Sequence, residues 1–238
     1  MLLEQGMADV VICGAVDFPM IETIVASFAT MNGAFRPKEG HPDPPPQKAS
    51  CPFSIDRRGF VVSEGAGCVI LTTRAFADLR RLSYHIEMAG WSMTADAHHF
   101  VAPNLETVRR CIAESISHAG LTPADIAAVN AHGTSTRVGD KVEADALREV
   151  FGDRIPPVSA NKSQIGHAMG ASSAIETIFT LEGMMRGKVL PTINYSPDPS
   201  IEMDCVPEGA RTLRQEHVLK NAFGFGGCNS CIVFRRIK

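Results

Sequence analysis

Two histidines and a lysine stand in short loops that also contain glycine. His132 opens the stretch HGTST (132–136), and His167 closes the stretch NKSQIGH (161–167), which also holds Lys162. A neutral imidazole can donate or accept one hydrogen bond to a developing charge, and glycine lets a ligand approach the backbone closely. We expect His167 just before a long helix, whose dipole disfavours the imidazolium form. By themselves these residues permit a hydrolase, a lyase or an acyl transferase, and an isolated histidine after a strand is more often structural.

The elements that must position these loops alternate between strands and helices. Helices are predicted where apolar residues recur every three or four positions or where a glycine stops the pattern, and strands where short apolar runs occur. This alternation predicts an α/β layered fold with a largely buried central sheet, in which loops at the carboxyl ends of strands bind ligands. The predicted helices are 105–119, 140–151 and 168–186, and the predicted strands are 9–16, 60–63, 68–72, 126–131, 157–160, 219–223 and 231–234.

The beginning of the chain differs in character from the rest. Residues 1–5 have the pattern of the last turns of a helix, with Gly6 as its stop, and the run 9–16 is continuously apolar, which is typical of a strand buried on both faces. The proline-rich segment 41–49 predicts a surface loop. We therefore divide the chain into 1–83 and 84–238.

Composition excludes several classes of function. The chain has 238 residues, of which 45% are hydrophobic and 21% charged, and its formal net charge is −3, so nothing favours binding to nucleic acid. No run approaches the ~20 apolar residues that span a bilayer, and we expect a cytosolic protein. Seven cysteines scattered among apolar residues indicate reduced thiols. Cys228 and Cys231 have the spacing of a redox or zinc motif but lack a second pair, so we predict no metal.

Three motifs in order carry a resemblance to a known family. HGTST (132–136), NKSQIGHAMGAS (161–172) and FGFGGCN (223–229) resemble the active-site signature of β-ketoacyl-acyl-carrier-protein synthases of the thiolase superfamily. The similarity extends to residues 6–17, 52–67 and 95–104 and so covers essentially the whole chain. It implies a thiolase-like layered α-β-α fold and a decarboxylative Claisen condensation of malonyl carrier protein with an acyl thioester. The type II enzymes of fatty-acid or polyketide synthesis look most similar.

The resemblance also implies roles for individual residues. His132 and His167 would bind the malonyl thioester carbonyl and stabilise the enolate that forms when carbon dioxide leaves. Lys162 and Glu176 look like the buried pair that orients the site. Phe225 resembles the gating phenylalanine, whose backbone N–H would complete the oxyanion hole.

Further residues would contact the substrate's phosphopantetheine arm. Thr134 and Thr136 resemble the hydroxyls that hold this arm, and Phe223 and Gly226 belong to the same predicted binding region. No cofactor is implied beyond the phosphopantetheine that the acyl carrier protein itself brings. Two departures stand out, because Val101 and Cys228 both occupy positions where relatives often have threonine.

The nucleophilic cysteine of this family is the main expectation that the chain does not meet. That cysteine begins a buried helix, where the dipole lowers its pKa, and residues 1–5 resemble the end of the same helix. The cysteine would therefore fall upstream of Met1, and neither Cys13 nor Cys51 has its context. We expect another segment or a second chain to supply it, within a homo- or heterodimer.

Two other functions fit the same motifs. A non-catalytic partner subunit, like the chain-length factors that pair with ketosynthases, would shape the acyl tunnel without performing chemistry. A thiolase acting on coenzyme A would share the ancestral fold. Retention of both histidines and Lys162 favours the condensing enzyme.

Overall fold

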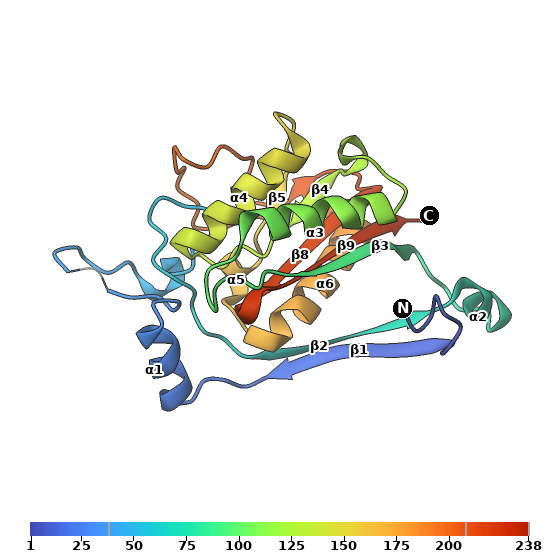
Figure 1. The fold of residues 1–238 in the computed structure, drawn as a ribbon, viewed down its shortest axis with the longest axis horizontal. Helices are drawn as coiled ribbons and strands as arrows, with labels where there is room; N and C mark the ends of the chain where they lie inside the picture. Colours follow the sequence, from blue (N-terminus) through green and yellow to red (C-terminus); the bar gives the residue numbers. More distant parts are fainter. Residues whose placement is uncertain (38, 208, 238) are drawn as a thin grey trace.

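The computed structural model describes residues 1–37, 39–207 and 209–237, and it has the predicted α/β class (Figure 1). The strands are β1 (Val10–Asp17), β2 (Gly65–Thr72), β3 (Ile86–Ala95), β4 (Ala128–Asn130), β5 (Val158–Ser159), β6 (Lys188–Val189), β7 (Arg211–Thr212), β8 (His217–Gly224) and β9 (Cys228–Arg236). The helices are α1 (Glu22–Thr30), α2 (Arg74–Leu79), α3 (Leu105–His118), α4 (Arg137–Phe151), α5 (Lys162–Ile165) and α6 (Met169–Arg186), with single 3₁₀ turns at η1 (Pro46–Lys48), η2 (Pro123–Asp125) and η3 (Phe225–Gly227).

A mixed five-stranded sheet forms the centre of the molecule. Its strand order is β3-β9-β8-β4-β5, in which β4 runs parallel to β5 and β8, while β8 and β3 are antiparallel to β9. Helix α3 packs on β3 and β9 and against α4, and α6 contacts β8 as well as β1 and β2. Helix α6 therefore lies between the central sheet and the antiparallel pair β1–β2, which gives the layered arrangement seen in Figure 1.

Local patterns explain the helices that were predicted. Helix α3 buries Val108, Ile112 and Ile116 on one face, and the Asn104 side chain caps its first turn by accepting a bond from the Thr107 N–H at 3.2 Å. Helix α6 ends at Gly187, which has the left-handed conformation that glycine adopts without strain. The predictions for 105–119, 140–151 and 168–186 are confirmed within a few residues.

Small residues allow α6 to lie close to β2. A Cβ atom added to Gly67 would stand 2.9 Å from the backbone of Ala174, and one added to Gly65 would stand 2.7 Å from the Ile175 side chain. The beginning of α6 buries Ala171 and Ser172. This close approach fixes the N-terminal end of α6, and with it the loop that carries His167.

The run at residues 9–16 is a strand, but the prediction that both of its faces are buried is wrong. Side chains of β1 alternate between half-buried and exposed, and Ile12 and Val16 are 71% and 77% exposed. On β2, Ile70 is 67% exposed on the same side of the pair. A continuous apolar run is typical of a strand covered on both faces, but it does not show which chain segment covers each face.

Of two other expectations in the first part of the chain, the helix end at 1–5 is present as one turn and the strand at 60–63 is not formed. Residues 1–5 form one helical turn, in which the Gln5 N–H bonds to the Met1 carbonyl, and Gly6 ends it with a positive φ of 66° as the Met7 N–H bonds to the Leu2 carbonyl, as predicted. Residues 60–63 make only isolated bridges, from Phe60 to Ala34 and from Val62 to His167. Helix α1 and the long strand β3 were not predicted. The hairpin of β8 and β9, the loop at 41–49 and the strands β4 and β5 agree with prediction, although β4 and β5 are shorter than expected.

No described helix is both long enough and apolar enough to cross a membrane.

Candidate active site

His132 and His167 meet in one large cavity. His132 follows β4, where Gly133 takes a positive φ of 40°, and His167 lies between α5 and α6. Their ring centroids are 5.7 Å apart and the rings stand edge to face. Both rings line a cavity of about 1190 Å³. The sequence-based prediction that two distant loops bring their imidazoles together agrees with this geometry.

A backbone bridge holds the His167 loop against the stretch that follows the proline-rich segment. The His167 N–H donates to the Val61 carbonyl at 2.7 Å, and the Ser63 N–H donates to the His167 carbonyl at 3.0 Å. The His167 Nδ1 atom lies 3.0 Å from the Ser172 hydroxyl on α6. The ring is therefore oriented from both sides, by the backbone and by the first turn of the helix.

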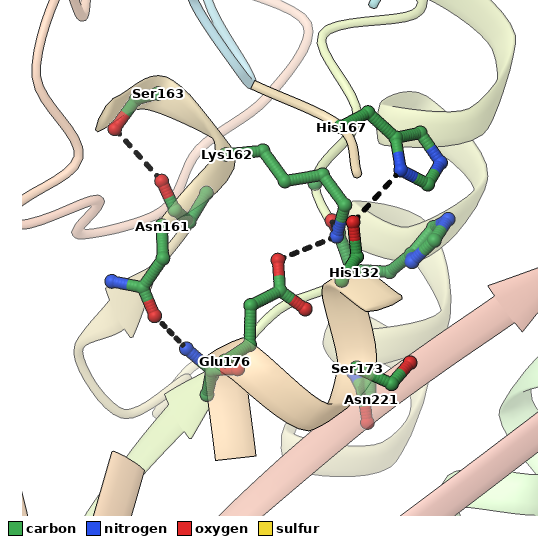
Figure 2. A network of polar contacts seen from close by, with 12 residues as sticks. His132, Asn161, Lys162, Ser163, His167, Ser173, Glu176 and Asn221 are labelled. Atoms are coloured by element: carbon green, nitrogen blue, oxygen red, sulfur yellow. Dashed lines mark hydrogen bonds and ion pairs between the residues drawn. The ribbon is translucent and has the colours of Figure 1, made fainter. Parts of the chain in front are cut away.

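Lys162 and Glu176 lie beneath the histidines as a buried ion pair. The Lys162 ammonium donates to Glu176 Oε1 and to the His132 carbonyl, both at 2.6 Å, and both side chains are at most 1% exposed (Figure 2). Neither residue lines the cavity. The pair therefore contacts the backbone of His132 without lining the cavity.

Burial and nearby positive charge keep both imidazoles neutral. Burial holds the pKa of His132 and the pKa of His167 well below the ordinary histidine value. The Lys162 ammonium is the next largest cause for both rings. The His132 Nδ1 atom has no hydrogen-bond partner within the described part of the chain. A neutral ring donates one hydrogen bond and accepts one, which suits stabilisation of an oxyanion without proton release to solvent.

Thr134 and Thr136 lie in the same cavity, just before α4. Their hydroxyl oxygens are 3.0 Å apart, and Thr136 is the N-cap residue of the helix. Ser135 between them has a positive φ of 69°. Both threonines line the cavity beside this turn.

Phe223 and Phe225 reach the cavity from the β8–β9 turn. The Phe223 ring packs against His132 at 5.6 Å, and the Phe225 ring stacks on Phe100 at 6.0 Å. Phe225 is 39% exposed, as a side chain at a cavity entrance would be. Gly226 does not line the cavity, and its N–H donates to the Phe100 carbonyl at 2.8 Å.

The two departures from the family pattern also face the cavity. Val101 and Cys228 both line it, and the Cys228 side chain is exposed while Cys231 is buried.

All seven cysteines are free. The Cys51 thiol is buried, and burial raises its pKa, which is the opposite of what a nucleophilic thiol needs. Within the described ranges, no group of three or more His, Cys, Asp or Glu side chains is arranged to hold a metal ion.

Two buried charged residues of the site were not predicted. Lys220 interrupts the apolar strand β8 and donates to Glu176 Oε2 at 2.9 Å, and Glu143 of α4 accepts bonds from the N–H groups of His132 and Gly133 at 2.9 and 2.8 Å. A lysine within a run of buried strand residues was the signal that could have identified the first. Glu143 carries no comparable signal, because acidic residues are common in amphipathic helices.

Comparison with protein families matches both parts of the chain. Residues 1–77 match the N-terminal domain of β-ketoacyl synthases, and residues 85–196 match their C-terminal domain. The 3-oxoacyl-[acyl-carrier-protein] synthase 2 of Rhizobium meliloti is 37% identical over 99% of this chain and 56% of its own length, and that of Staphylococcus aureus is 35% identical over 100% and 57%. The chain thus spans a little over half the length of these relatives.

Solved structures give the same result. A type II polyketide synthase ketosynthase in complex with its acyl-carrier protein (AntDE:AntF) superposes with a TM-score of 0.93 at 32% identity, over 100% of this chain and 58% of its own. The ishigamide ketosynthase/chain length factor gives 0.90 at 31% identity, and a β-ketoacyl synthase from Burkholderia phymatum gives 0.90 at 34%, each over 100% of this chain and 56% and 57% of theirs. The fold is that of the thiolase-like ketosynthases. With both domains matched and the motif residues gathered in one cavity, the chain belongs to the β-ketoacyl synthase family.

Proposed function

We propose that this chain provides the decarboxylating part of a β-ketoacyl-acyl-carrier-protein synthase. The observation that supports this most directly is the pair of imidazoles, with ring centroids 5.7 Å apart, that line one cavity together with Thr134 and Thr136. Both relatives above are named 3-oxoacyl-[acyl-carrier-protein] synthase 2, and one solved neighbour is a ketosynthase bound to its carrier.

The chemistry follows from where negative charge develops. Loss of carbon dioxide from a malonyl thioester leaves an electron pair on carbon 2, which is delocalised onto the thioester oxygen as an enolate. Hydrogen bonds from His132 and His167 stabilise that oxygen. When Ser172 donates to Nδ1 of His167, the ring proton is on Nε2 and available to the oxygen. The enolate carbon then attacks an acyl thioester on a cysteine, whose thiolate leaves.

The nucleophilic cysteine comes, in this proposal, from another segment or another chain. No cysteine of this chain stands at the N-terminus of a described helix. The exposed apolar face of β1 and β2, with Ile12, Val16 and Ile70, is a surface on which further protein would pack. The assembly would be a dimer of like or unlike subunits, as in the neighbours that pair with a chain length factor.

Thr134 and Thr136 bind the phosphopantetheine arm of an acyl carrier protein in this scheme. The arm enters past Phe225, which rests on Phe100 at the cavity entrance. Phe223 and Gly226 belong to the same entrance turn. The carrier brings this prosthetic group as part of the substrate, and no other cofactor is needed for the condensation.

The test is decarboxylation of malonyl carrier protein by the chain together with the polypeptide that supplies the cysteine. Replacing one oxyanion donor costs on the order of 100- to 1000-fold in kcat, so His132→Ala and His167→Ala should each lose about that much. His85→Ala is the matched control, because His85 is exposed and lies outside the cavity. Full activity of His167→Ala would instead favour a non-catalytic partner subunit, and turnover of coenzyme A thioesters in place of carrier thioesters would favour a thiolase.

A further inference from the structure

A closed ring of buried polar contacts surrounds the backbone of His132. On one side, its carbonyl accepts from Lys162, which pairs with Glu176 Oε1. On the other side, its N–H donates to Glu143 Oε1 at 2.9 Å, and the same oxygen accepts from the Asn221 side chain at 3.0 Å. The first arm therefore ends at Glu176 of α6, and the second ends at strand β8, where Asn221 is the neighbour of Lys220.

Lys220 closes this ring. Its ammonium donates to Glu176 Oε2 at 2.9 Å and to the Asn221 carbonyl at 2.8 Å. Glu176 thus receives one lysine on each carboxylate oxygen, Lys162 from α5 and Lys220 from β8. Figure 2 shows the Glu176 and Lys162 part of this network between α6 and the histidine loops.

Burial makes the second lysine unusual. Lys220 is 2% exposed and stands next to Leu219, which is fully buried. A buried ammonium is costly unless a partner compensates it, and one carboxylate already neutralises Lys162. The Glu143 carboxylate, which accepts from the His132 N–H, is the second acidic group of the network, and Lys220 is among the charges that lower the pKa of that imidazole, after burial, Lys162 and His167.

We propose that Lys220 is a positioning residue for His132. By binding the second oxygen of Glu176, its ammonium fixes the carboxylate that holds Lys162 under the His132 carbonyl, and it adds positive charge behind the imidazole. Lys220 does not line the cavity, so it acts through Glu176 and Lys162 and not on substrate. The proposal rests on the proposed function only for the catalytic role of His132. The contacts that Lys220 makes do not depend on any reaction.

The first test observes His132 directly. Carbon-13 labelled histidine gives a resonance for His132 that His132→Gln identifies by its loss. Lys220→Met keeps the length of the side chain and removes the charge, so the resonance of His132 should shift and the pKa of His132 should rise. Lys220→Arg keeps the charge, so the resonance and the pKa of His132 should stay close to those of the wild type. Lys188→Met is the matched control, since Lys188 is an exposed lysine bonded to Thr212. A folded Lys220→Met with an unchanged His132 titration overturns the proposal, because a merely structural lysine would lower stability and leave the imidazole as it was.

A second variant covers the case in which Lys220→Met does not fold. Lys220→Ala leaves a buried cavity of the size of n-propylammonium, which has the three carbons and one nitrogen that the substitution removes. This cation should restore both the fold and the His132 signal in a saturable manner, and 1-propanol, of equal size but uncharged, should not. Recovery by neither compound, or by both equally, contradicts the proposal.

Kinetics separate this proposal from the proposed function. If the wild-type assembly decarboxylates malonyl carrier protein, Lys220→Met should lower kcat on the order of 100-fold with KM unchanged, as expected when a catalytic group is misplaced by about 1 Å. If the wild type shows no such activity, the proposed function fails while the His132 measurements still decide the role of Lys220. An unchanged kcat in Lys220→Met overturns the positioning role.

Discussion

The imidazoles of His132 and His167 stand edge to face with their centroids 5.7 Å apart. His132 lies in the loop after β4, whereas His167 lies in the loop between α5 and α6. His132 follows β4 and is held through its bonds to Lys162 of α5 and Glu143 of α4. His167 is fixed from the other side, through α6 and the bridge to Val61. Each ring is therefore held by its own set of contacts.

Removing the shared carboxylate should destabilise the chain strongly. Glu176→Ala leaves the Lys162 and Lys220 ammonium groups buried without their common partner, and breaking a buried pair from one side costs about 3–5 kcal/mol. The free energy of unfolding in urea measures this loss. Glu182→Ala on the same helix removes only an exposed pair with Arg186 and should cost no more than about 1 kcal/mol. Equal losses for the two variants would show that the buried network contributes little.

Stability should fall in mild acid because of the two histidines. In the folded chain the pKa of each imidazole is held well below its ordinary value, whereas in the unfolded chain each ring binds a proton below a pH of about 6.5. The unfolded state then binds more protons, so each ring lowers the free energy of unfolding by up to about 1.4 kcal/mol per pH unit below 6.5. Urea unfolding at pH 7.5 and pH 5.5 should show a smaller difference for His132→Gln/His167→Gln than for the wild type. His85→Gln, at an exposed site, is the control, and an identical pH dependence of all three proteins would rule out this origin.

The threonine hydroxyls should matter for binding more than for the chemical step. Thr134→Val and Thr136→Val each remove a hydroxyl from a residue that lines the cavity, and one lost hydrogen bond costs about 0.5–1.5 kcal/mol. We expect KM for malonyl carrier protein to rise by roughly two- to tenfold with kcat nearly unchanged. Thr177→Val is the control, because the Thr177 hydroxyl bonds only to the Ser173 carbonyl of its own helix. A fall in kcat at constant KM would place the threonines in the chemistry instead.

The outer face of β1 and β2 should make the isolated chain self-associate. Ile12, Val16 and Ile70 form an exposed apolar surface, and such surfaces mark interaction or aggregation sites. The chain alone should bind a hydrophobic dye and elute early in size-exclusion chromatography, and Ile12→Asp/Val16→Asp should reduce both effects. Leu79→Asp, at an exposed leucine of α2, should not reduce them. A monomeric, dye-free wild-type chain would argue against an interaction surface here.

The sequence by itself determined the elements whose signals are local. The spacing of Val108, Ile112 and Ile116 predicts α3, Gly187 predicts the end of α6, and the glycine-rich turn at 224–227 predicts the hairpin of β8 and β9. The three motifs were also sufficient to identify the family. These features depend on neighbouring residues along one element, so periodicity and turn chemistry are enough to recognise them.

Tertiary structure alone decided which charges share a partner and which faces stay open. Lys220 and Glu176 are 44 residues apart, and only the packing of α6 against β8 brings the second ammonium to the carboxylate. The outer face of β1 is exposed because nothing in the described chain covers it, although the apolar residues of that strand are typical of a buried strand. Pairing across elements and the covering of a face depend on how layers stack, and a pattern within one segment contains no information about its neighbours in space.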